Sequence, residues 1–190
     1  MDVVSSSESG VPEGYVIRSV RAGEWREVRE LRLAALLDPV AHLAFLETYE
    51  DAVARSDAYW KERAEGAAEG VRERQQFVAE TRGDGWVGTV TVLVEEAGVR
   101  DFFGEVVERR QGHLVGVFLR EGHRGKGVGE ALFAAALEWA REVGVDRARL
   151  FVHEGNGRAA AFYRRVGFVA SGVIVEGDAG RELEYGLDLA

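Results

Sequence analysis

Stretches in which apolar and polar residues alternate, or in which apolar residues run together, predict the strands of a sheet. They lie at residues 15–20, 76–80, 86–94, 113–119, 149–152, 168–175 and 181–189. A glycine-containing turn at residues 82–85 joins the second and third of them into a hairpin. Val90, Val92 and Val94 share one face of the third strand, as alternation with a period of two requires.

Apolar residues at helical spacing predict helices between these strands. The helices lie at residues 23–37, 40–69, 128–143 and 156–165, and the pattern is weakest in the second. Asp38–Pro39 ends the first helix, and Gly167 follows the last. Residues 95–112 are charged and carry no periodic pattern, so we expect a long, mobile loop there.

The order of these elements indicates an α/β (α+β) fold in which helices cover a mixed sheet. A chain of 190 residues has the length of one domain. We therefore expect a single domain over residues 14–190, with a central mixed, mostly antiparallel, twisted sheet of six to seven strands and about four flanking helices. Residues 1–13 are expected to form a flexible tail.

The composition excludes several kinds of chemistry. The chain has no cysteine, which excludes a disulfide scaffold, a thiolate metal site and a cysteine nucleophile. Its four histidines include no pair at the spacing of a structural zinc site, so no metal site is expected. With 24 Lys and Arg against 33 Asp and Glu, the net charge of −9 argues against a nonspecific nucleic-acid binder. An acidic surface attracts cations instead, including protonated amines.

The chain carries no pattern that targets a membrane. No apolar run reaches the ~18 residues that a membrane span needs, and the first residues lack the pattern of a signal peptide. We therefore expect a cytoplasmic protein with no membrane partner. Nearly all basic residues are arginines, with Lys61 and Lys126 as the two lysines, which indicates a GC-rich, bacterial genome.

A glycine-rich turn, Arg120–Gly129, lies between a predicted strand and a predicted helix. Such a turn binds anions, because successive backbone N–H groups converge there and the helix dipole adds positive charge. A Walker A loop is excluded because Gly127, and not Ser or Thr, follows Lys126. A dinucleotide fingerprint is excluded because the glycines have G-x-G-x-G spacing. A tight connection without a ligand is the remaining alternative.

Two segments resemble one known family, the GNAT superfamily of acyl-CoA-dependent N-acetyltransferases. Residues 124–129, Arg-Gly-Lys-Gly-Val-Gly, fit its R/Q-x-x-G-x-G/A pyrophosphate loop. Residues 156–163, Asn-Gly-Arg-Ala-Ala-Ala-Phe-Tyr, followed by Val166–Phe168, resemble its second motif. The resemblance covers about residues 75–170 well, and the order and separation of the two motifs make chance agreement improbable.

The resemblance implies a GNAT-like domain, acetyl-CoA as the cofactor and an amine as the acceptor. The loop amides would hold the pyrophosphate of coenzyme A, the strand before it would pair with the pantetheine arm, and Asn156 would contact the pantetheine. Tyr163 would be the catalytic general acid near the thioester sulfur. The implied cofactor-binding residues are Val117, Phe118, Leu119, Arg124, Gly125, Lys126, Gly127, Val128, Gly129 and Asn156.

The spacing of these residues agrees with those roles. Asn156 and Tyr163 are seven residues apart, which is two helical turns, so both project from one face. Gly116 interrupts an apolar strand and predicts a bulge or a close backbone approach. The alternatives are an ordinary core aromatic for Tyr163, and for Asn156 a helix N-cap, which is compatible with cofactor contact.

Acyl transfer to an amine requires the amine to lose its proton. An alkyl amine has a pKa of about 10.4, so only about one molecule in 10³ is neutral at pH 7. We expect direct attack in a ternary complex, with an oxyanion held by a backbone N–H near Leu119 and with Tyr163 protonating the departing thiolate. Because the chain has no cysteine, a cysteinyl-acyl intermediate is excluded.

The general base is left open by the sequence. The candidates at predicted strand edges are His113, Glu80, Glu95, Glu121 and Glu154. For His113, an ordinary exposed strand end is the simpler explanation, and none of the five is assigned as catalytic.

Acceptor selection is expected to rest on residues 38–60 and 172–181, which flank the acceptor site in the family. Aromatic and acidic side chains there suit an amine: Tyr49, Tyr59, Trp60, Glu47, Glu50 and Asp57. A solvated acidic helix is the simpler explanation. A polyamine, an amino acid, an antibiotic and a protein amine all remain candidates.

The first functional hypothesis is therefore an acetyl-CoA-dependent N-acetyltransferase. The second is a catalytically silent acyl-CoA-binding regulatory module, and the third is a protein-interaction domain that binds no coenzyme A. The presence of Tyr163 and the intact loop at residues 124–129 favour the enzyme. The apolar residues 168–175 are expected to complete the sheet rather than form a dimer edge, so a homodimer stays open.

Overall fold

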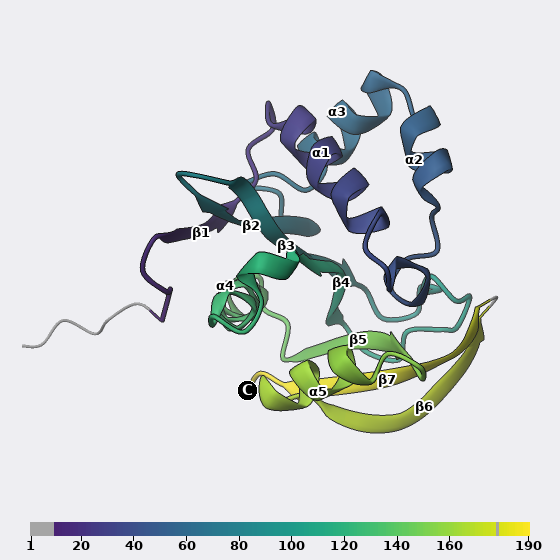
Figure 1. Cartoon of the computed structure of the whole chain (residues 1–190). Helices are drawn as coiled ribbons and strands as arrows, with labels where there is room; N and C mark the ends of the chain where they lie inside the picture. Colours follow the sequence, from purple (N-terminus) through teal and green to yellow (C-terminus); the bar gives the residue numbers. More distant parts are fainter. Residues whose placement is uncertain (1–9, 178) are drawn as a thin grey trace, which may run out of the picture.

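The sheet contains seven strands, and the helices lie on both of its faces (Figure 1). The structure is a computed structural model that describes residues 10–177 and 179–190. Its strands are β1 (Tyr15–Ser19), β2 (Arg74–Thr81), β3 (Gly85–Glu95), β4 (Gln111–Leu119), β5 (Arg147–His153), β6 (Val169–Gly177) and β7 (Gly180–Asp188). Its helices are α1 (Trp25–Leu36), α2 (Tyr49–Ala54), α3 (Asp57–Glu65), α4 (Val128–Glu142) and α5 (Gly157–Arg165), with 3₁₀ turns η1 (Ala41–Leu43) and η2 (Glu121–His123). The predicted fold class is confirmed, with five α-helices where about four were expected.

The sheet is antiparallel except at one central pair of strands. The strand order is β1-β2-β3-β4-β5-β7-β6, and β4 runs parallel to β5. These two strands pair only at Gly112 with Ala148 and at His113 with Arg149. Beyond His113 they separate, so that the sheet opens into a V between β4 and β5 (Figure 1).

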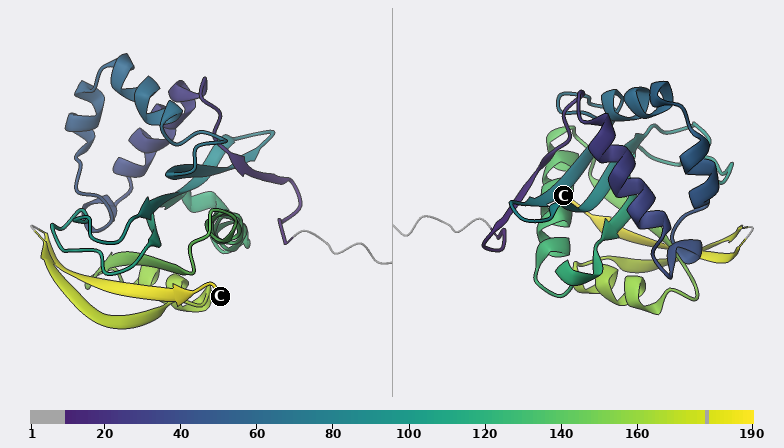
Figure 2. Two further views of the ribbon diagram at one scale, coloured as in Figure 1. Left: turned by 180° about the vertical axis from the view of Figure 1, so that it is seen from behind. Right: turned by 45° about the horizontal axis from the view of Figure 1, so that its top comes forward.

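The alternation of residues along the strands sends side chains into two separate cores. Phe77 and Ala79 of β2 join a core with α4, while Val78 between them joins a core with α1 and α3. All three are at most 6% exposed, because both faces of the strand are covered by helices. Figure 2 shows the two helical layers, with α1–α3 on one side and α4 on the other.

The predicted bulge in β4 is confirmed at Gly116. Thr89 of β3 lies opposite Phe118, and Thr91 lies opposite Val115, so β4 has one extra residue between these pairs. Gly116 takes up the irregularity with a φ of +64°, a backbone conformation that favours glycine. Among the described residues, neither Gly116 nor Val117 has a partner residue in a neighbouring strand. The bulge therefore lies where β4 leaves β5.

The segment predicted as one weak helix over residues 40–69 is divided into η1, α2 and α3. Two local start signals explain the division. The hydroxyl of Thr48 accepts a hydrogen bond from the N–H of Asp51 at 3.2 Å, and the hydroxyl of Ser56 accepts one from the N–H of Tyr59 at 3.2 Å. Each is a helix N-cap, which begins a new helix.

The segment between β3 and β4, predicted as a long mobile loop, has its own hydrogen-bonded structure. The side chain of Asp101 accepts hydrogen bonds from the backbone N–H groups of Phe103 and Glu105, both at 2.9 Å. Arg100 and Val106 form an antiparallel bridge. Residues 96–110 therefore form the predicted long loop, and an aspartate side chain organises a turn in it that no periodic pattern reveals. Its mobility stays a prediction.

The ends of the chain and of the sheet complete the description. Residues 1–9 of the predicted tail lie outside the described residues, while Pro12 lies close to the glycine-rich loop at Gly127. At the opposite edge of the sheet, β6 pairs with β7 as predicted, and Val169, Val173 and Ile174 are exposed on it. Across residues 10–177 and 179–190, no helix is both long and apolar enough to span a membrane.

Candidate functional site

The glycine-rich loop between β4 and α4 has the backbone geometry of an anion site. Gly125 and Gly127 have φ values of +71° and +82°. Gly127 occupies the N-cap position of the 15-residue helix α4, which has no side-chain cap. The N–H groups of the first turn are therefore available, and the helix dipole favours negative charge beside them. A Cβ atom at Gly129 would lie 3.1 Å from the ring of Phe162, so this glycine allows α4 to approach α5 closely.

Arg124 anchors this loop to neighbouring elements. Its Nε donates a hydrogen bond to the carbonyl oxygen of Leu119 at 2.8 Å, and its Nη2 donates to Asp38. Burial raises the pKa of Asp38, but the hydrogen bonds from Arg124 and from the N–H of Val40, together with nearby positive charge, bring that pKa below its usual value. The side chain of Arg124 is thus held in place, whereas Lys126 is exposed.

A cavity of about 320 Å³ begins at this loop and extends between α4 and α5. Most of the predicted cofactor residues line it: Val117, Phe118, Leu119, Arg124, Gly125, Gly129 and Asn156. The other three do not: Val128 is fully buried in the core, Lys126 is exposed and Gly127 is half-buried. Arg158 and Arg165 of α5 also line the cavity and were missed by sequence reasoning. The sequence feature that could have revealed them is the set of arginines in the helix of the second motif.

A second, larger cavity of about 800 Å³ lies on the other side of the V. Residues from η1, α1 and α3 form one wall, and the β6–β7 hairpin forms another. Phe102 and Phe103 of the β3–β4 segment also line the cavity, together with Gly177 and Ala179 of the hairpin. Both segments that were expected to flank an acceptor contribute to its lining.

The two cavities meet at the splayed ends of β4 and β5. Val117, Asn156 and Tyr163 line both of them. The side chain of Asn156 accepts a hydrogen bond from the N–H of Ala159 at 3.2 Å, which confirms its predicted role as an N-cap. Tyr163 is 8% exposed and packs against Phe133 and Phe168.

The environment of Tyr163 keeps its hydroxyl protonated. Burial raises the pKa of this phenol well above its usual value of about 10, and the nearby carboxylate of Glu182 raises the pKa further. A phenol at the junction of two cavities that stays protonated at neutral pH can donate a proton or a hydrogen bond to a developing anion.

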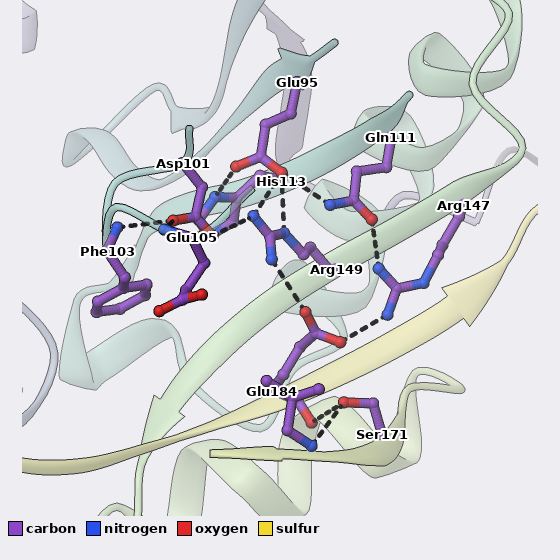
Figure 3. Close-up of polar contacts among 11 residues, drawn as sticks. Glu95, Asp101, Phe103, Glu105, Gln111, His113, Arg147, Arg149, Ser171 and Glu184 are labelled. Carbon is purple, nitrogen blue, oxygen red and sulfur yellow. Dashed lines mark hydrogen bonds and ion pairs between the residues drawn. The ribbon is translucent and has the colours of Figure 1, made fainter. Parts of the chain in front are cut away.

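A buried network of charged side chains lies at the closed end of the V (Figure 3). Glu95 of β3 accepts hydrogen bonds from Nδ1 of His113 at 2.8 Å and from Nε of Arg149 at 2.9 Å. Arg149 also contacts Asp101 at 2.8 Å and Glu184 at 3.0 Å. The network joins β3, β4, β5, β7 and the β3–β4 segment around His113 and Arg149, one of the two pairs between β4 and β5.

The five candidates for a general base are placed very differently. The expectation of an exposed strand end is wrong for His113, which is 5% exposed and lines the larger cavity. Glu95 lies behind it in the charged network. Glu80 pairs with Arg18, Glu154 pairs with Arg181 and Glu121 is exposed in η2. The last three line neither cavity.

The aromatic and acidic residues considered for an amine are only partly brought together. Tyr59 and Glu47 line the larger cavity. Trp60 is fully buried in the core between α1 and α3, and Glu50 and Asp57 are exposed away from the cavity, as a solvated helix predicts. Tyr49 packs against that same core.

The charged network predicts a loss of stability in acid. Burial alone would raise the pKa of Glu95, but hydrogen bonds from His113 and Arg149 lower it to about 2. Because the folded-state pKa lies below the unfolded value, Glu95 stabilises the protein above pH ~4.5, and this contribution is lost as the pH falls toward ~2. Its size is about 3 kcal/mol, since one pKa unit corresponds to about 1.4 kcal/mol.

Urea unfolding of Glu95→Gln and of the wild type, measured near pH 7 and pH 3, checks this. The variant should be less stable by a few kcal/mol near neutral pH and should lose less stability on acidification. Glu96→Gln is the matched control, because Glu96 is an exposed neighbour that pairs with Arg110 on the surface. If Glu95→Gln and the wild type lose equal stability on acidification, Glu95 is not the source of the acid sensitivity.

Comparisons with known proteins agree on one family. The model of the acetyltransferase (GNAT) family matches residues 25–168. L-methionine sulfoximine/L-methionine sulfone acetyltransferases from Pseudomonas paraeruginosa and Pseudomonas aeruginosa are each 30% identical over 151 residues, which cover 76% of this chain and 83% of each relative.

Solved structures share the fold at lower identity. A GNAT-family acetyltransferase from Streptococcus pneumoniae has a TM-score of 0.70 at 19% identity, covering 92% of this chain and 99% of the other. A phosphinothricin acetyltransferase from Sinorhizobium meliloti, solved with acetyl-CoA, has a TM-score of 0.68 at 17% identity, covering 93% and 89%. At these identities the likeness concerns the arrangement of the elements.

Proposed function

The chain belongs to the acetyltransferase (GNAT) family, and from this premise we propose how its two cavities divide the reaction. It is an acetyl-CoA-dependent enzyme that acetylates an amine. The smaller cavity takes the donor, and the larger cavity takes the acceptor. The observation that carries the proposal is the shared lining of the two cavities at Val117, Asn156 and Tyr163, because donor and acceptor must meet at one point.

The donor side fits coenzyme A in charge and in shape. The uncapped first turn of α4 suits a pyrophosphate, and Arg158 adds positive charge along the smaller cavity, where Arg124 and Arg165 are paired with Asp38 and Glu130. The backbone of β4 beyond the bulge has no partner strand on the β5 side, so it can pair with an extended, amide-bearing chain. When bound, acetyl-CoA supplies the acetyl group as an activated thioester.

Two side chains handle the protons in the proposed mechanism. His113 accepts the proton of the acceptor's ammonium group at Nε2, because Nδ1 is held by the ionised carboxylate of Glu95 and must carry the ring hydrogen. Tyr163 donates its hydroxyl proton to the departing thiolate. Backbone N–H groups beside the bulge support the oxyanion. Transfer is direct, since the chain contains no cysteine to carry the acyl group.

Thiol release from acetyl-CoA, measured across a panel of amines and amino acids, tests this function. The wild type should release thiol in proportion to the acetylated acceptor, and mass spectrometry should find no acetylated enzyme after incubation with acetyl-CoA alone. Stoichiometric binding of coenzyme A without turnover on any acceptor would instead support the silent regulatory module.

Replacement of His113 by glutamine is expected to lower kcat by about 10²-fold or more, which is the usual contribution of general base catalysis. Steady-state assays with a preferred acceptor measure this loss.

His42→Gln is the control for this variant, because His42 is exposed at the same cavity. It should keep the wild-type kcat. A folded His113→Gln enzyme that turns over at the wild-type rate would exclude His113 as the base.

Several finer expectations stay predictions. A cytoplasmic location and the absence of nucleic-acid and membrane partners are among them. A homodimer also stays a prediction, and the exposed apolar side chains Val173 and Ile174 on the edge strand β6 are the surface on which it would form.

A further inference from the structure

The charged residues of the larger cavity are distributed unevenly between its two walls. The wall formed by α1, α3, β2 and the segment around α2 carries four arginines and one glutamate: Arg32, Arg55, Arg63, Arg74 and Glu47. The wall formed by the β6–β7 hairpin carries two glutamates, Glu176 and Glu182. A cavity with one positive and one negative wall occurs here in a chain whose net charge is −9.

The single glutamate of the positive wall is already occupied. Glu47 accepts a hydrogen bond from Nε of Arg32 at 3.1 Å and lies 3.6 Å from Nε of Arg55. Its side chain is only 14% exposed. Glu47 therefore neutralises part of the charge of these two arginines, and its carboxylate is not free to bind another cation.

Arg63 and Arg74 have no such partner. Among the described residues, no carboxylate lies within 4.0 Å of either guanidinium. Nη1 of Arg63 donates to the hydroxyl of Tyr59 at 3.3 Å, which positions the side chain without neutralising it. The pKa of Arg32 is lowered by burial and by the positive charge of Arg63, so the two guanidiniums are close enough to repel each other. An anion bound there would relieve this repulsion.

The negative wall lies at the other end, next to the proposed reaction point. Glu182 acts electrostatically on the hydroxyl of Tyr163, which places its carboxylate near the junction of the two cavities. A carboxylate there attracts the ammonium form of an acceptor and brings the nitrogen to Tyr163 and His113.

Resting on the proposed function, we propose that the acceptor is a small amino carboxylate, whose amine lies beside Glu182 and whose carboxylate is bound by Arg63 and Arg74. Arginine forms paired hydrogen bonds with a carboxylate, and such bonds fix orientation as well as adding affinity. A polyamine would place a second positive charge against the arginine wall, which is unfavourable. The amino-acid acceptors named for the 30%-identical relatives belong to the same chemical class.

The test compares each acceptor with a partner that differs only in its carboxylate. L-Methionine sulfone and other L-amino acids are each paired with their methyl ester. Spermidine serves as an acceptor that carries amines and no carboxylate. The free acids should have kcat/KM values about tenfold or more above those of their esters. The ester amines lose their protons more readily, so this bias works against the expected result.

The variants Arg63→Gln and Arg74→Gln locate the carboxylate site. Each should raise the KM of the preferred free acid about tenfold or more, with little change in kcat and none in the KM of its ester. Calorimetric titration of that acid into the enzyme saturated with coenzyme A should show the same loss of affinity. Arg26→Gln is the matched control, because Arg26 is an exposed residue of α1 that stacks on Trp25 outside the cavity.

Each outcome decides between the alternatives. Equal or better turnover of the esters or of spermidine, or an unchanged KM in both arginine variants, overturns the carboxylate site while leaving the acetyltransferase intact. Bound coenzyme A without turnover of any amine contradicts the proposed function itself.

Discussion

Replacement of Tyr163 by phenylalanine is expected to lower kcat by about 10²-fold or more without weakening the binding of acetyl-CoA. The hydroxyl lies where the donor and acceptor cavities meet, and burial together with the charge of Glu182 raises its pKa. It is therefore present as the acid at neutral pH. Phenylalanine keeps the ring that packs against Phe133 and Phe168, so the fold should be retained. Steady-state kinetics measure the change in kcat, and equilibrium binding of acetyl-CoA measures any change in affinity.

Tyr185→Phe provides the comparison. Tyr185 is also buried, and its hydroxyl accepts a hydrogen bond from Arg164 at 3.1 Å, but it lines neither cavity. This variant should lose a little stability and keep its kcat. If Tyr163→Phe turns over at the wild-type rate, the acid role is wrong and Tyr163 is a core aromatic only.

Replacement of Gly127 by valine should weaken acetyl-CoA binding about 10²-fold or more. Gly127 has a φ of +82°, which a β-branched residue adopts only at a cost of about 1–3 kcal/mol. A Cβ there would also lie 3.4 Å from Pro12, on the approach to the first turn of α4. Valine should therefore move or cover the N–H groups that the pyrophosphate needs. Calorimetric titration with coenzyme A measures the loss.

Gly98→Val separates the effect on the cofactor from backbone strain. Gly98 has nearly the same φ, +84°, with open space around it, and it lies between β3 and β4 outside both cavities. Both variants should lose similar stability, but only Gly127→Val should lose affinity. An unchanged affinity of a folded Gly127→Val protein would falsify the proposed pyrophosphate site.

The local geometry of the proposed donor half could largely be predicted from the sequence, because its determinants are local. A glycine loop, a helix start and a tyrosine two turns after Asn156 are each contained within about ten residues, where backbone geometry follows directly from residue type. The bulge at Gly116 is also determined locally. These features require no knowledge of how distant segments pack.

The segments flanking the proposed acceptor half were anticipated from the family resemblance, but its individual side chains could not be predicted, because they depend on contacts between segments far apart in the chain. Arg63 and Glu182 face one cavity from opposite ends of the sequence, and neither belongs to a pattern. His113 was expected at an exposed strand end because the sequence does not reveal that Glu95 of the neighbouring strand faces it across the sheet. In the same way, the interpretation of residues 95–112 missed that Asp101 pairs with the buried Arg149.

The single parallel pair of strands has a consequence for how such an enzyme can diverge. Because β4 and β5 run in the same direction, the connections that follow them emerge at one edge, and residues 111–165 alone supply the loop, Asn156 and Tyr163. The arginine wall comes from residues 32–74 and the acidic wall from residues 176–182. Mutations that exchange one acceptor for another can therefore accumulate in these outer segments while the chemistry of the donor stays unchanged. Within such a lineage, new acceptor specificities are reachable by substitutions in the segments that form the two walls of the larger cavity.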